Sequence, residues 1–549
     1  MNYVFIFRHL SAVCWMLGGF MLFSVPWALP AFGGNWQYEK SGTFGLFVSV
    51  GVCAGCALLL RYIGRKNGGT SSSDVFSKKD ATAVVAFSWL FATVLGALPF
   101  LFSGTQRCEG IPMSVGDAVF ESMSGFTTTG ATVFAELERP DLLSRCVLFW
   151  RCSTHFLGGL GIMVLFVVLL GIGTGSKTLF RSEVASSKNS PKERIRQLAR
   201  IVFRIFIALN AAQTVLLVLQ GLTVYDALCH SFSTTATGGF STFNAGAGHF
   251  AAHGYKYAAA VELTLVLFMF LGGTNFILLY YLFRGQPSKL FGDREWRTYT
   301  GIIAVSVLIV FAAGWVHSDF DIYGTSDKPV LSFSDGTSSA AKTAAAANLP
   351  PVHSFRVVLF QIVSIITTTG LCTDEFEKWS AVSCGVLVIL MFIGGCSGST
   401  SGGFKVFRMI CLMKAVPQEI ELSYRPNVVR PLLIGGAPVD KEMVHHVIVH
   451  FAVLTLAFLC GTFLILCFEP SSTWNVQHVA GDRKLVDTSA AAAACLNNVG
   501  AGFGIVGARQ NYGIFSEGAK FVYAALMMLG RLELFTVLAL CMPRFWNND

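Results

Sequence analysis

Long apolar runs alternate with short polar segments along the whole chain. Each run is long enough to cross the ~30 Å hydrocarbon core of a bilayer as a helix. Uninterrupted apolar runs of this length are typical of transmembrane helices rather than of helices in a soluble core. The pattern therefore predicts an all-α membrane protein with ten transmembrane helices, at about residues 10–29, 44–63, 81–102, 146–172, 201–220, 257–283, 299–316, 381–413, 444–468 and 517–542.

The composition supports this fold class. Hydrophobic residues make up 53% of the 549 residues, and charged residues make up 13%. An ordinary soluble domain carries roughly twice that charged fraction. The chain therefore has too few charges to cover the surfaces of several soluble domains.

The formal net charge of +8 does not indicate a nucleic-acid-binding protein. Such a protein collects its basic residues on one face or stripe, whereas here they fall in short blocks between the apolar runs. This distribution is typical of loops on the cytoplasmic side of a membrane. With those loops inside, both termini are also expected in the cytoplasm, and no nucleic-acid partner is expected.

Four links on the opposite side of the predicted membrane share one pattern. In each link, an apolar segment too short to span is followed by a turn of small residues and glycine. The four links are at residues 117–134, 226–243, 355–376 and 487–507, and they align on Gly130, Gly238, Gly370 and Gly500. The order of helix, re-entrant turn and helix is thus repeated four times.

The repeated turns predict a pore. Irregular backbone at membrane depth is tolerated only where it is buried in protein or lines a water-filled path. Small side chains and a glycine that can adopt positive φ let successive carbonyl oxygens point inward, and a ring of carbonyls can replace the hydration shell of a monovalent cation. One such turn alone would indicate an ordinary loop or helix cap, but four in equivalent places favour a cation filter.

Two further features fall in the apolar runs. The eighth run is interrupted by a glycine- and serine-rich segment at 394–405, which predicts a broken helix that faces the pore, or else a bend made for packing. The last run contains Arg531 and Glu533. An ionisable residue inside a membrane indicates a functional site, so Arg531 is expected either in the permeation path as an electrostatic barrier or in a structural pair with a carboxylate.

Six sequence motifs together resemble those of the TrkH potassium-uptake subunits in the Trk/Ktr/HKT superfamily of cation transporters. The motifs are SGFTTTGATVF, STTATGGFST, TTTGL, NNVGAGFG, GGCSGSTSGGFK and MLGRLELFTVL, and they extend from about residue 117 to 542. The resemblance implies four M1–pore loop–M2 repeats in a pseudo-fourfold arrangement around one pore, preceded by two extra helices. The implied units are residues 1–79 for the two N-terminal helices and 80–176, 177–284, 285–414 and 415–549 for the repeats, with a low-complexity outer loop at 319–350.

The resemblance also implies the roles of particular residues, with potassium bound at the filter. The implied filter residues are Thr128, Thr129, Gly130, Ala236, Thr237, Gly238, Thr368, Thr369, Gly370, Asn498, Val499 and Gly500. The implied gating loop contains Gly394, Gly395, Gly398, Ser399, Thr400, Gly402, Gly403 and Lys405, and Arg531 takes the role of a pore arginine. Glycine rather than serine at position 130 favours potassium over sodium, whereas the fourth turn departs from the pattern because it lacks threonines.

The partners follow from the same resemblance. It implies a homodimer in the bacterial inner membrane and a cytosolic ring of TrkA-type nucleotide-binding subunits that controls the gate. No glycine-rich nucleotide motif follows a predicted strand in this chain, so nucleotide control is expected from the partner. The chain itself is expected to hold no cofactor, and potassium is the transported ion.

Two mechanisms of potassium uptake remain open. The first is a gated pore with downhill flux, and the alternative is a symporter that couples potassium to protons or sodium. A coupled carrier needs an ionisable residue near the midplane, for which Arg531 and Glu533 are the clear candidates, and an arginine that stays charged cannot relay protons. The gated pore is therefore favoured. An enzyme is not expected, because the histidines at 445, 446 and 450 do not form a zinc-protease motif.

Overall fold

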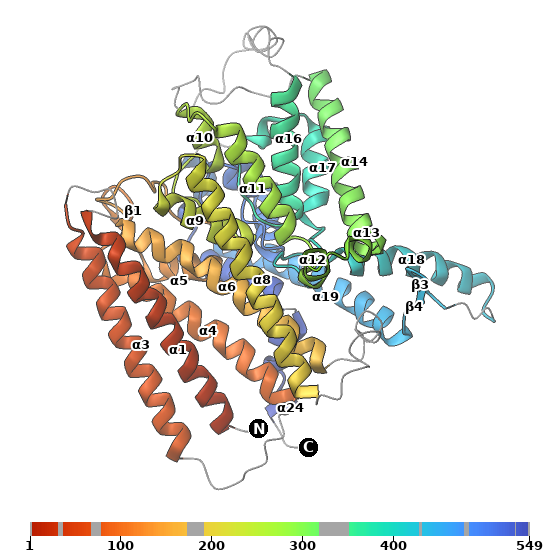
Figure 1. Ribbon diagram of the computed structural model, residues 1–549, viewed down its shortest axis with the longest axis horizontal. Helices are drawn as coiled ribbons and strands as arrows, with labels where there is room; N and C mark the ends of the chain where they lie inside the picture. Colours follow the sequence, from red (N-terminus) through yellow and green to blue (C-terminus); the bar gives the residue numbers. More distant parts are fainter. Residues whose placement is uncertain are drawn as a thin grey trace.

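The computed structural model describes residues 3–30, 37–66, 78–172, 191–317, 351–427, 431–476, 483–532 and 534–546. These residues are mostly helical (Figure 1). The predicted outer loop at 319–350 and Glu533 lie outside the described residues.

The first helices form a bundle at one edge of the molecule. α1 (Tyr3–Ser24) packs along α3 (Lys40–Lys66), and α4 (Lys78–Phe102) lies beside both (Figure 1). Leu10, Cys14, Leu17 and Met21 recur every three or four residues of α1 and are buried, which is the spacing of one helix face. Other faces of the bundle expose large apolar side chains such as Phe44, as expected for helices that contact lipid.

Six helices among the described residues are long and apolar enough to cross a membrane. They fall on six of the ten predicted spans. The six are Tyr3–Ala28, Lys40–Arg65, Lys79–Phe102, Gln197–Leu219, Arg294–Val316 and Lys441–Phe468. A further predicted span, 146–172, coincides with α6 (Arg145–Ile172).

Helices are broken within three of the predicted spans, at 257–283, 381–413 and 517–542, and the break in the second of these was predicted at 394–405. α11 (Ala258–Gly272) and α12 (Phe276–Phe283) meet at 109°, and α22 (Glu517–Arg531) and α23 (Leu534–Cys541) meet at 117°. α17 (Ala381–Met391) and α18 (Val406–Tyr424) are separated by the glycine-rich segment. α11 ends at Gly272, whereas α22 ends at Arg531, one residue after Gly530, and hydropathy alone does not register such breaks.

Four shorter helices precede the glycine turns. They are α5 (Val115–Phe126), α9 (Val224–Thr235), α16 (Pro351–Ile366) and α21 (Lys484–Leu496). Side-chain caps begin the first two: the Ser114 side chain accepts from the backbone N–H of Asp117 in a full capping box, and the Thr223 side chain accepts from Asp226. Such caps satisfy backbone donors that the first helical turn leaves unpaired.

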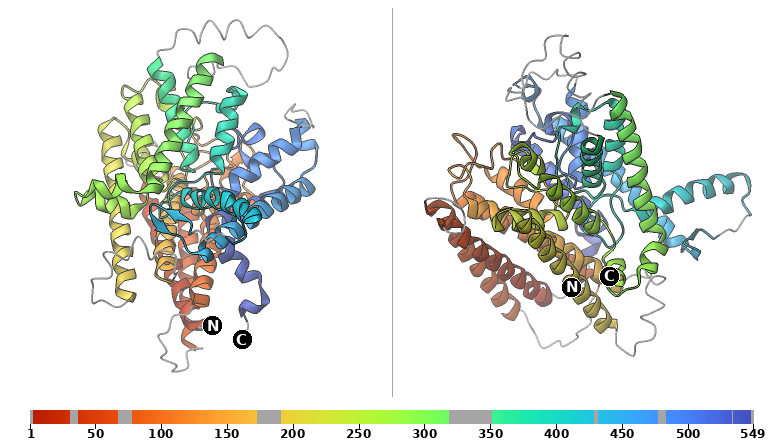
Figure 2. Two further views of the ribbon diagram at one scale, coloured as in Figure 1. Left: turned by 90° about the vertical axis from the view of Figure 1, so that its right-hand side faces the viewer. Right: turned by 45° about the horizontal axis from the view of Figure 1, so that its top comes forward.

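The C-terminal part of the chain packs against its first third. α22 packs against α5, and the rings of Tyr512 and Phe120 lie 5.2 Å apart between centroids. The two ends of the chain also lie on the same side of the molecule (Figures 1 and 2).

The remaining elements are η1 (Val25–Ala28), β1 (Gln106–Cys108), β2 (Ile111–Pro112), α8 (Pro191–Leu219), η2 (Gly246–Gly248), α10 (His249–Ala252), α13 (Pro287–Gly292), α14 (Arg294–His317), η3 (Phe376–Lys378), β3 (Leu433–Ile434), β4 (Ala437–Pro438), α19 (Lys441–Phe468), α20 (Ser472–Val476), η5 (Gly504–Val506), η6 (Tyr512–Ile514) and α24 (Pro543–Trp546).

Candidate functional site

The four glycine turns have the same backbone conformation. Each places a non-glycine residue at positive φ, and these are the only such residues in the described parts of the chain: Thr128 (φ 50°), Thr237 (54°), Thr368 (57°) and Asn498 (56°). Two residues further on, each turn has a glycine at positive φ: Gly130 (82°), Gly239 (89°), Gly370 (75°) and Gly500 (82°). Positive φ is a genuine outlier for a β-branched threonine, so four matching turns indicate one shared structural requirement.

This conformation corrects the alignment of the second turn by one residue. The residue equivalent to Gly130 is Gly239, not Gly238, and the residue equivalent to Thr128 is Thr237. Ala236 therefore corresponds to Thr127, ahead of the left-handed residue. Two consecutive glycines made the alignment ambiguous. The pattern that follows, in which Phe134 matches Phe243 four residues after the glycine, could have resolved it.

The four turns close into a ring. A Cβ atom added to each turn glycine would overlap the carbonyl oxygen of the residue before the glycine in the next turn. The contacts are Gly130 with Gly238 (2.2 Å), Gly239 with Thr369 (2.0 Å), Gly370 with Val499 (2.0 Å) and Gly500 with Thr129 (2.2 Å). The fourth contact leads back to the first turn, so the ring is complete, and backbone meets backbone at every junction.

Each turn is held to its own short helix. The backbone N–H of the residue before the turn glycine donates to a carbonyl five residues earlier. These bonds join Thr129 to Ser124 (2.9 Å), Gly238 to Ser233 (2.7 Å), Thr369 to Ser364 (2.8 Å) and Val499 to Ala494 (2.8 Å). The helix ends therefore fix the turns through the last carbonyl groups that the helices leave unpaired.

In three of the repeats, the long helix after the turn approaches its own short helix through a glycine, at Gly158, Gly272 and Gly530. A Cβ atom at Gly158 would lie 2.1 Å from the carbonyl oxygen of Phe126, and at Gly530 it would lie 1.8 Å from that of Leu496. The third repeat differs, because a Cβ at Gly394 would instead meet the carbonyl oxygen of Gly402, at 2.2 Å. The segment 394–405 thus folds back on itself at the position where the other repeats have a direct helix contact.

This segment is bonded to the second and third repeats. Thr400 Oγ1 donates to the carbonyl oxygens of Gly272 and Thr235, at 3.0 Å each. The backbone N–H of Gly402 donates to Thr368 Oγ1 at 2.7 Å, and Thr368 is the left-handed residue of the third turn. The glycine-rich segment is therefore attached directly to the ring.

Arg531 bonds to the same segment. Its side chain is buried, and Nη1 donates to the carbonyl oxygen of Thr400 at 2.7 Å. In the part of the chain that the structure describes, Arg531 has no ion pair with a carboxylate, and its Nε and Nη2 have no hydrogen-bond acceptor. Arg531 therefore holds the segment from the side of the fourth repeat.

A carboxylate that the sequence did not single out anchors the other side of the segment. Glu295, in the first turn of α14, is buried, and its Oε1 accepts from the backbone N–H groups of Ser397 (2.6 Å) and Phe407 (3.1 Å). Phe407 lies in the first turn of α18, whose N-cap Lys405 makes no side-chain cap. Glu295 lies on α14 and thus caps the N-terminus of α18. The dipole of α18 favours a negative charge at that end.

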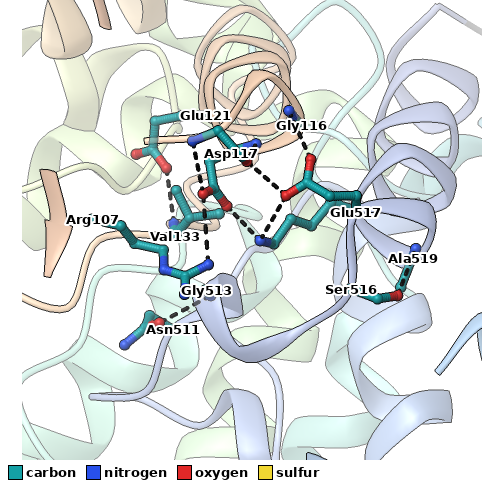
Figure 3. A network of polar contacts seen from close by, with 12 residues as sticks. Arg107, Gly116, Asp117, Glu121, Val133, Asn511, Gly513, Ser516, Glu517 and Ala519 are labelled. Atoms are coloured by element: carbon teal, nitrogen blue, oxygen red, sulfur yellow. Dashed lines mark hydrogen bonds and ion pairs between the residues drawn. The ribbon is translucent and has the colours of Figure 1, made fainter. Parts of the chain in front are cut away.

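Ion pairs attach the first turn of α5 to α22 (Figure 3). Asp117 lies 2.5 Å from Lys520 Nζ and 3.6 Å from Arg107 Nη1, and both Asp117 and Lys520 are 1% exposed. Glu517 accepts from the backbone N–H of Gly116 at 2.9 Å. The charge of Asp117 is therefore compensated within the protein.

Acidic residues also follow the third turn. Glu375 pairs with Arg509 at 3.1 Å, which links the segments after the third and fourth turns. Burial, reinforced by the nearby charge of Glu375, raises the pKa of the Glu377 carboxyl to about 7. Glu377 is thus only partly ionised near neutral pH.

Comparison with known proteins identifies the family. The family model for TrkH, described as a cation transport protein, matches residues 67–547. The chain belongs to the TrkH family. This assignment confirms the resemblance found in the sequence, and it confirms that the chain is a transporter rather than an enzyme.

Relatives of this TrkH-family chain have similar length. The Trk system potassium uptake protein TrkH of Salmonella typhimurium is 32% identical over 474 residues, which cover 86% of each chain. TrkH of Escherichia coli strain K12 is 31% identical with the same coverage. The crystal structure of the potassium transporter TrkH from Vibrio parahaemolyticus matches with a TM-score of 0.77 and 29% identity, covering 100% of both chains.

The ring of this TrkH-family chain predicts a steric effect of one substitution. We expect Gly239→Ala to destabilise the protein, because the new Cβ would overlap the Thr369 carbonyl oxygen and alanine disfavours positive φ. The midpoint of thermal unfolding of the purified protein measures the effect. Gly385→Ala on α17 is the control, because a Cβ there has no atom within 4 Å. Equal stability of Gly239→Ala and the control would contradict the close contact.

Proposed function

We propose that this chain is a potassium-selective pore for potassium uptake across the bacterial inner membrane. The observation that carries the proposal is the closed ring of four backbone turns, each bonded to the end of a short helix. Such a ring can offer carbonyl oxygens to a dehydrated monovalent cation. The names of the relatives, which are potassium uptake proteins, support potassium as the ion.

The proposed architecture is four M1–pore loop–M2 repeats around this ring, with ten transmembrane spans. The order of contacts around the ring follows the order of the turns in the chain. Both termini are proposed to be cytoplasmic, which agrees with their position on one side of the molecule (Figure 2). Dimerisation and control by TrkA-type nucleotide-binding subunits are part of the proposal and rest on the family.

The proposed filter follows the backbone conformation rather than the sequence alignment. It contains Thr128–Gly130, Thr237–Gly239, Thr368–Gly370 and Asn498–Gly500. Gly239 thus replaces Ala236 as the third member of the second turn. Potassium is proposed to bind at the carbonyl oxygens of these residues.

The segment 394–405 is proposed to be the gate. It is bonded to Thr235 and Thr368 at the ring and to Arg531 on α22, so in this conformation it is attached to three repeats. Opening requires that these bonds break or move together. Arg531 is proposed to contribute both a bond to the closed segment and a positive charge that opposes cations.

The proposed function predicts flux that follows the potassium gradient. Purified protein in liposomes, with the voltage set by an ionophore, should pass potassium and rubidium but little sodium at fixed pH. Protein-free liposomes are the control. Flux that requires a proton or sodium gradient would instead establish a symporter.

The filter proposal predicts lower selectivity for Gly130→Ser. A serine side chain would overlap the Gly238 carbonyl oxygen and is strained at φ 82°. We expect the ratio of rubidium to sodium flux to fall in liposomes, while Gly385→Ala keeps the wild-type ratio. An unchanged ratio in folded Gly130→Ser protein would remove Gly130 from the filter.

The gate proposal predicts that Arg531→Ala raises potassium flux. The substitution removes the bond to Thr400 and the buried positive charge. The initial rate of rubidium uptake into liposomes measures the effect, with the exposed Arg544→Ala variant as the control. Reduced flux with unchanged thermal stability would assign Arg531 a supporting role in the open pore instead.

A further inference from the structure

We infer that the buried ion pair between Glu121 and Arg151 positions the first two turns of the ring and thereby sets its ion selectivity. The inference rests on the proposed function, and it assigns both residues as positioning residues rather than ion ligands. Glu121 lies on α5, nine residues before Gly130, and Arg151 lies on α6.

The pair is short and completely enclosed. Arg151 Nε lies 2.6 Å from Glu121 Oε1, and the two side chains are 2% and 0% exposed. Removing two charges from water is costly, and the structure retains such a pair only with good geometry and further hydrogen bonds. The further bonds of this pair lead to the first two turns.

The carboxylate of Glu121 holds the segment after the first turn. It accepts from the backbone N–H of Val133 at 2.9 Å and from Thr132 Oγ1 at 3.0 Å. Thr132 Oγ1 in turn accepts from the backbone N–H of Phe134 at 3.1 Å. These residues begin two positions after Gly130, so Glu121 fixes the direction in which the chain leaves the first turn.

The guanidinium group of Arg151 holds the segment after the second turn. Its Nη1 donates to the carbonyl oxygen of Ser241 at 3.2 Å, and its Cζ lies 3.4 Å from the centroid of the Phe240 ring. Phe240 and Ser241 directly follow Gly239. One ion pair therefore links the segments after two adjoining turns, and those turns meet where Gly130 contacts Gly238.

Glu375 and Arg509 also link the segments after two turns, but no other repeat has a carboxylate at the position of Glu121. The residues equivalent to Glu121 are His230, Gln361 and Ala491, each nine positions before the turn glycine. His230 Nε2 pairs with Ser241 Oγ at 3.1 Å, within its own repeat. In the fourth repeat, Ala491 and Gly502 have no side chains that could form the equivalent bond. Of these four residues, Glu121 alone is a carboxylate. It pairs with Arg151, and Arg151 in turn bonds to Ser241 of the next repeat.

Another ion pair between two repeats provides a control, in which Glu262 is buried and Arg356 is partly exposed. Arg356 Nε lies 2.7 Å from Glu262 Oε2, between α16 and α11. This pair also joins two repeats, but Arg356 lies near the start of α16, 14 residues before Gly370. A general loss of stability or of inter-repeat contact should therefore affect both pairs, whereas a loss of turn geometry should affect only the pair of Glu121 and Arg151.

The test compares selectivity in paired neutral variants. Wild-type protein, Glu121→Gln/Arg151→Gln and Glu262→Gln/Arg356→Gln are reconstituted in liposomes, and the ratio of rubidium to sodium flux is measured. Each double variant removes one positive and one negative charge, so the net charge stays constant. We expect the ratio of the Glu121 and Arg151 variant to fall roughly tenfold, the order of effect of one lost charged hydrogen bond, and the control variant to keep the wild-type ratio.

A single conservative variant covers the case in which the double variant does not fold. Arg151→Lys keeps a positive charge beside Glu121 but has no planar fork to reach Ser241 and stack on Phe240, so the ratio should fall while rubidium flux persists. A wild-type ratio in the folded variants of this pair would overturn the inference and leave the proposed function intact. A wild-type protein that does not discriminate between rubidium and sodium would overturn both.

Discussion

Each turn of the ring can approach its neighbour only because a glycine stands at the contact. At all four junctions, a single Cβ atom would overlap a carbonyl oxygen of the next turn. The same turns place three threonines and one asparagine at positive φ, and each residue in that conformation costs roughly 1–2 kcal/mol. The turns retain this conformation for two reasons. Carbonyl groups at the ends of the short helices accept hydrogen bonds from the turns, and the close contact with the neighbouring turn leaves no space for a different backbone conformation.

The supports behind the ring are unequal, although the ring itself is regular. The first repeat uses a charged pair, and the second uses a histidine bonded to a serine. The fourth has Ala491 at the equivalent place, whose side chain forms no hydrogen bond. In the third repeat, the glycine-rich segment occupies the place where the long helix meets the short one in the others. Four turns of the same backbone conformation are thus supported by chemically different contacts in each repeat.

Much of this arrangement could be predicted from the sequence, since hydropathy and repetition carry most of it. Seven predicted spans coincide with single long helices, and the four turns were found because small residues and glycine recur in the same place. The bends after Gly272 and Arg531 were not predicted, because an apolar run does not record a bend, whereas the break at 394–405 was predicted from its glycines and serines. The one-residue error at Gly238 arose because only φ distinguishes two adjacent glycines.

The contribution of Glu295 could not be predicted, for a different reason. Its partners are backbone N–H groups 102 and 112 residues away in the chain, and a backbone N–H carries no sequence signature. Arg151 was missed similarly, since its partners beyond Glu121 are a carbonyl oxygen and the face of a phenylalanine ring. Sequence reasoning located the irregular segments and Arg531, which bonds to one of them, but not Glu295 or Arg151.

The single oxygen atom of Glu295 that bonds both Ser397 and Phe407 has a mechanical consequence. α18 projects sideways from the body of the molecule (Figures 1 and 2), and its first turn shares this acceptor with the glycine-rich segment. α18 follows directly on the segment at Lys405, so a displacement of its projecting end reaches the segment through the backbone, and the shared oxygen of Glu295 adds a second connection. The position of α18 is thereby coupled to Thr400 and Gly402, the two residues through which the segment is bonded to the ends of the second and third short helices.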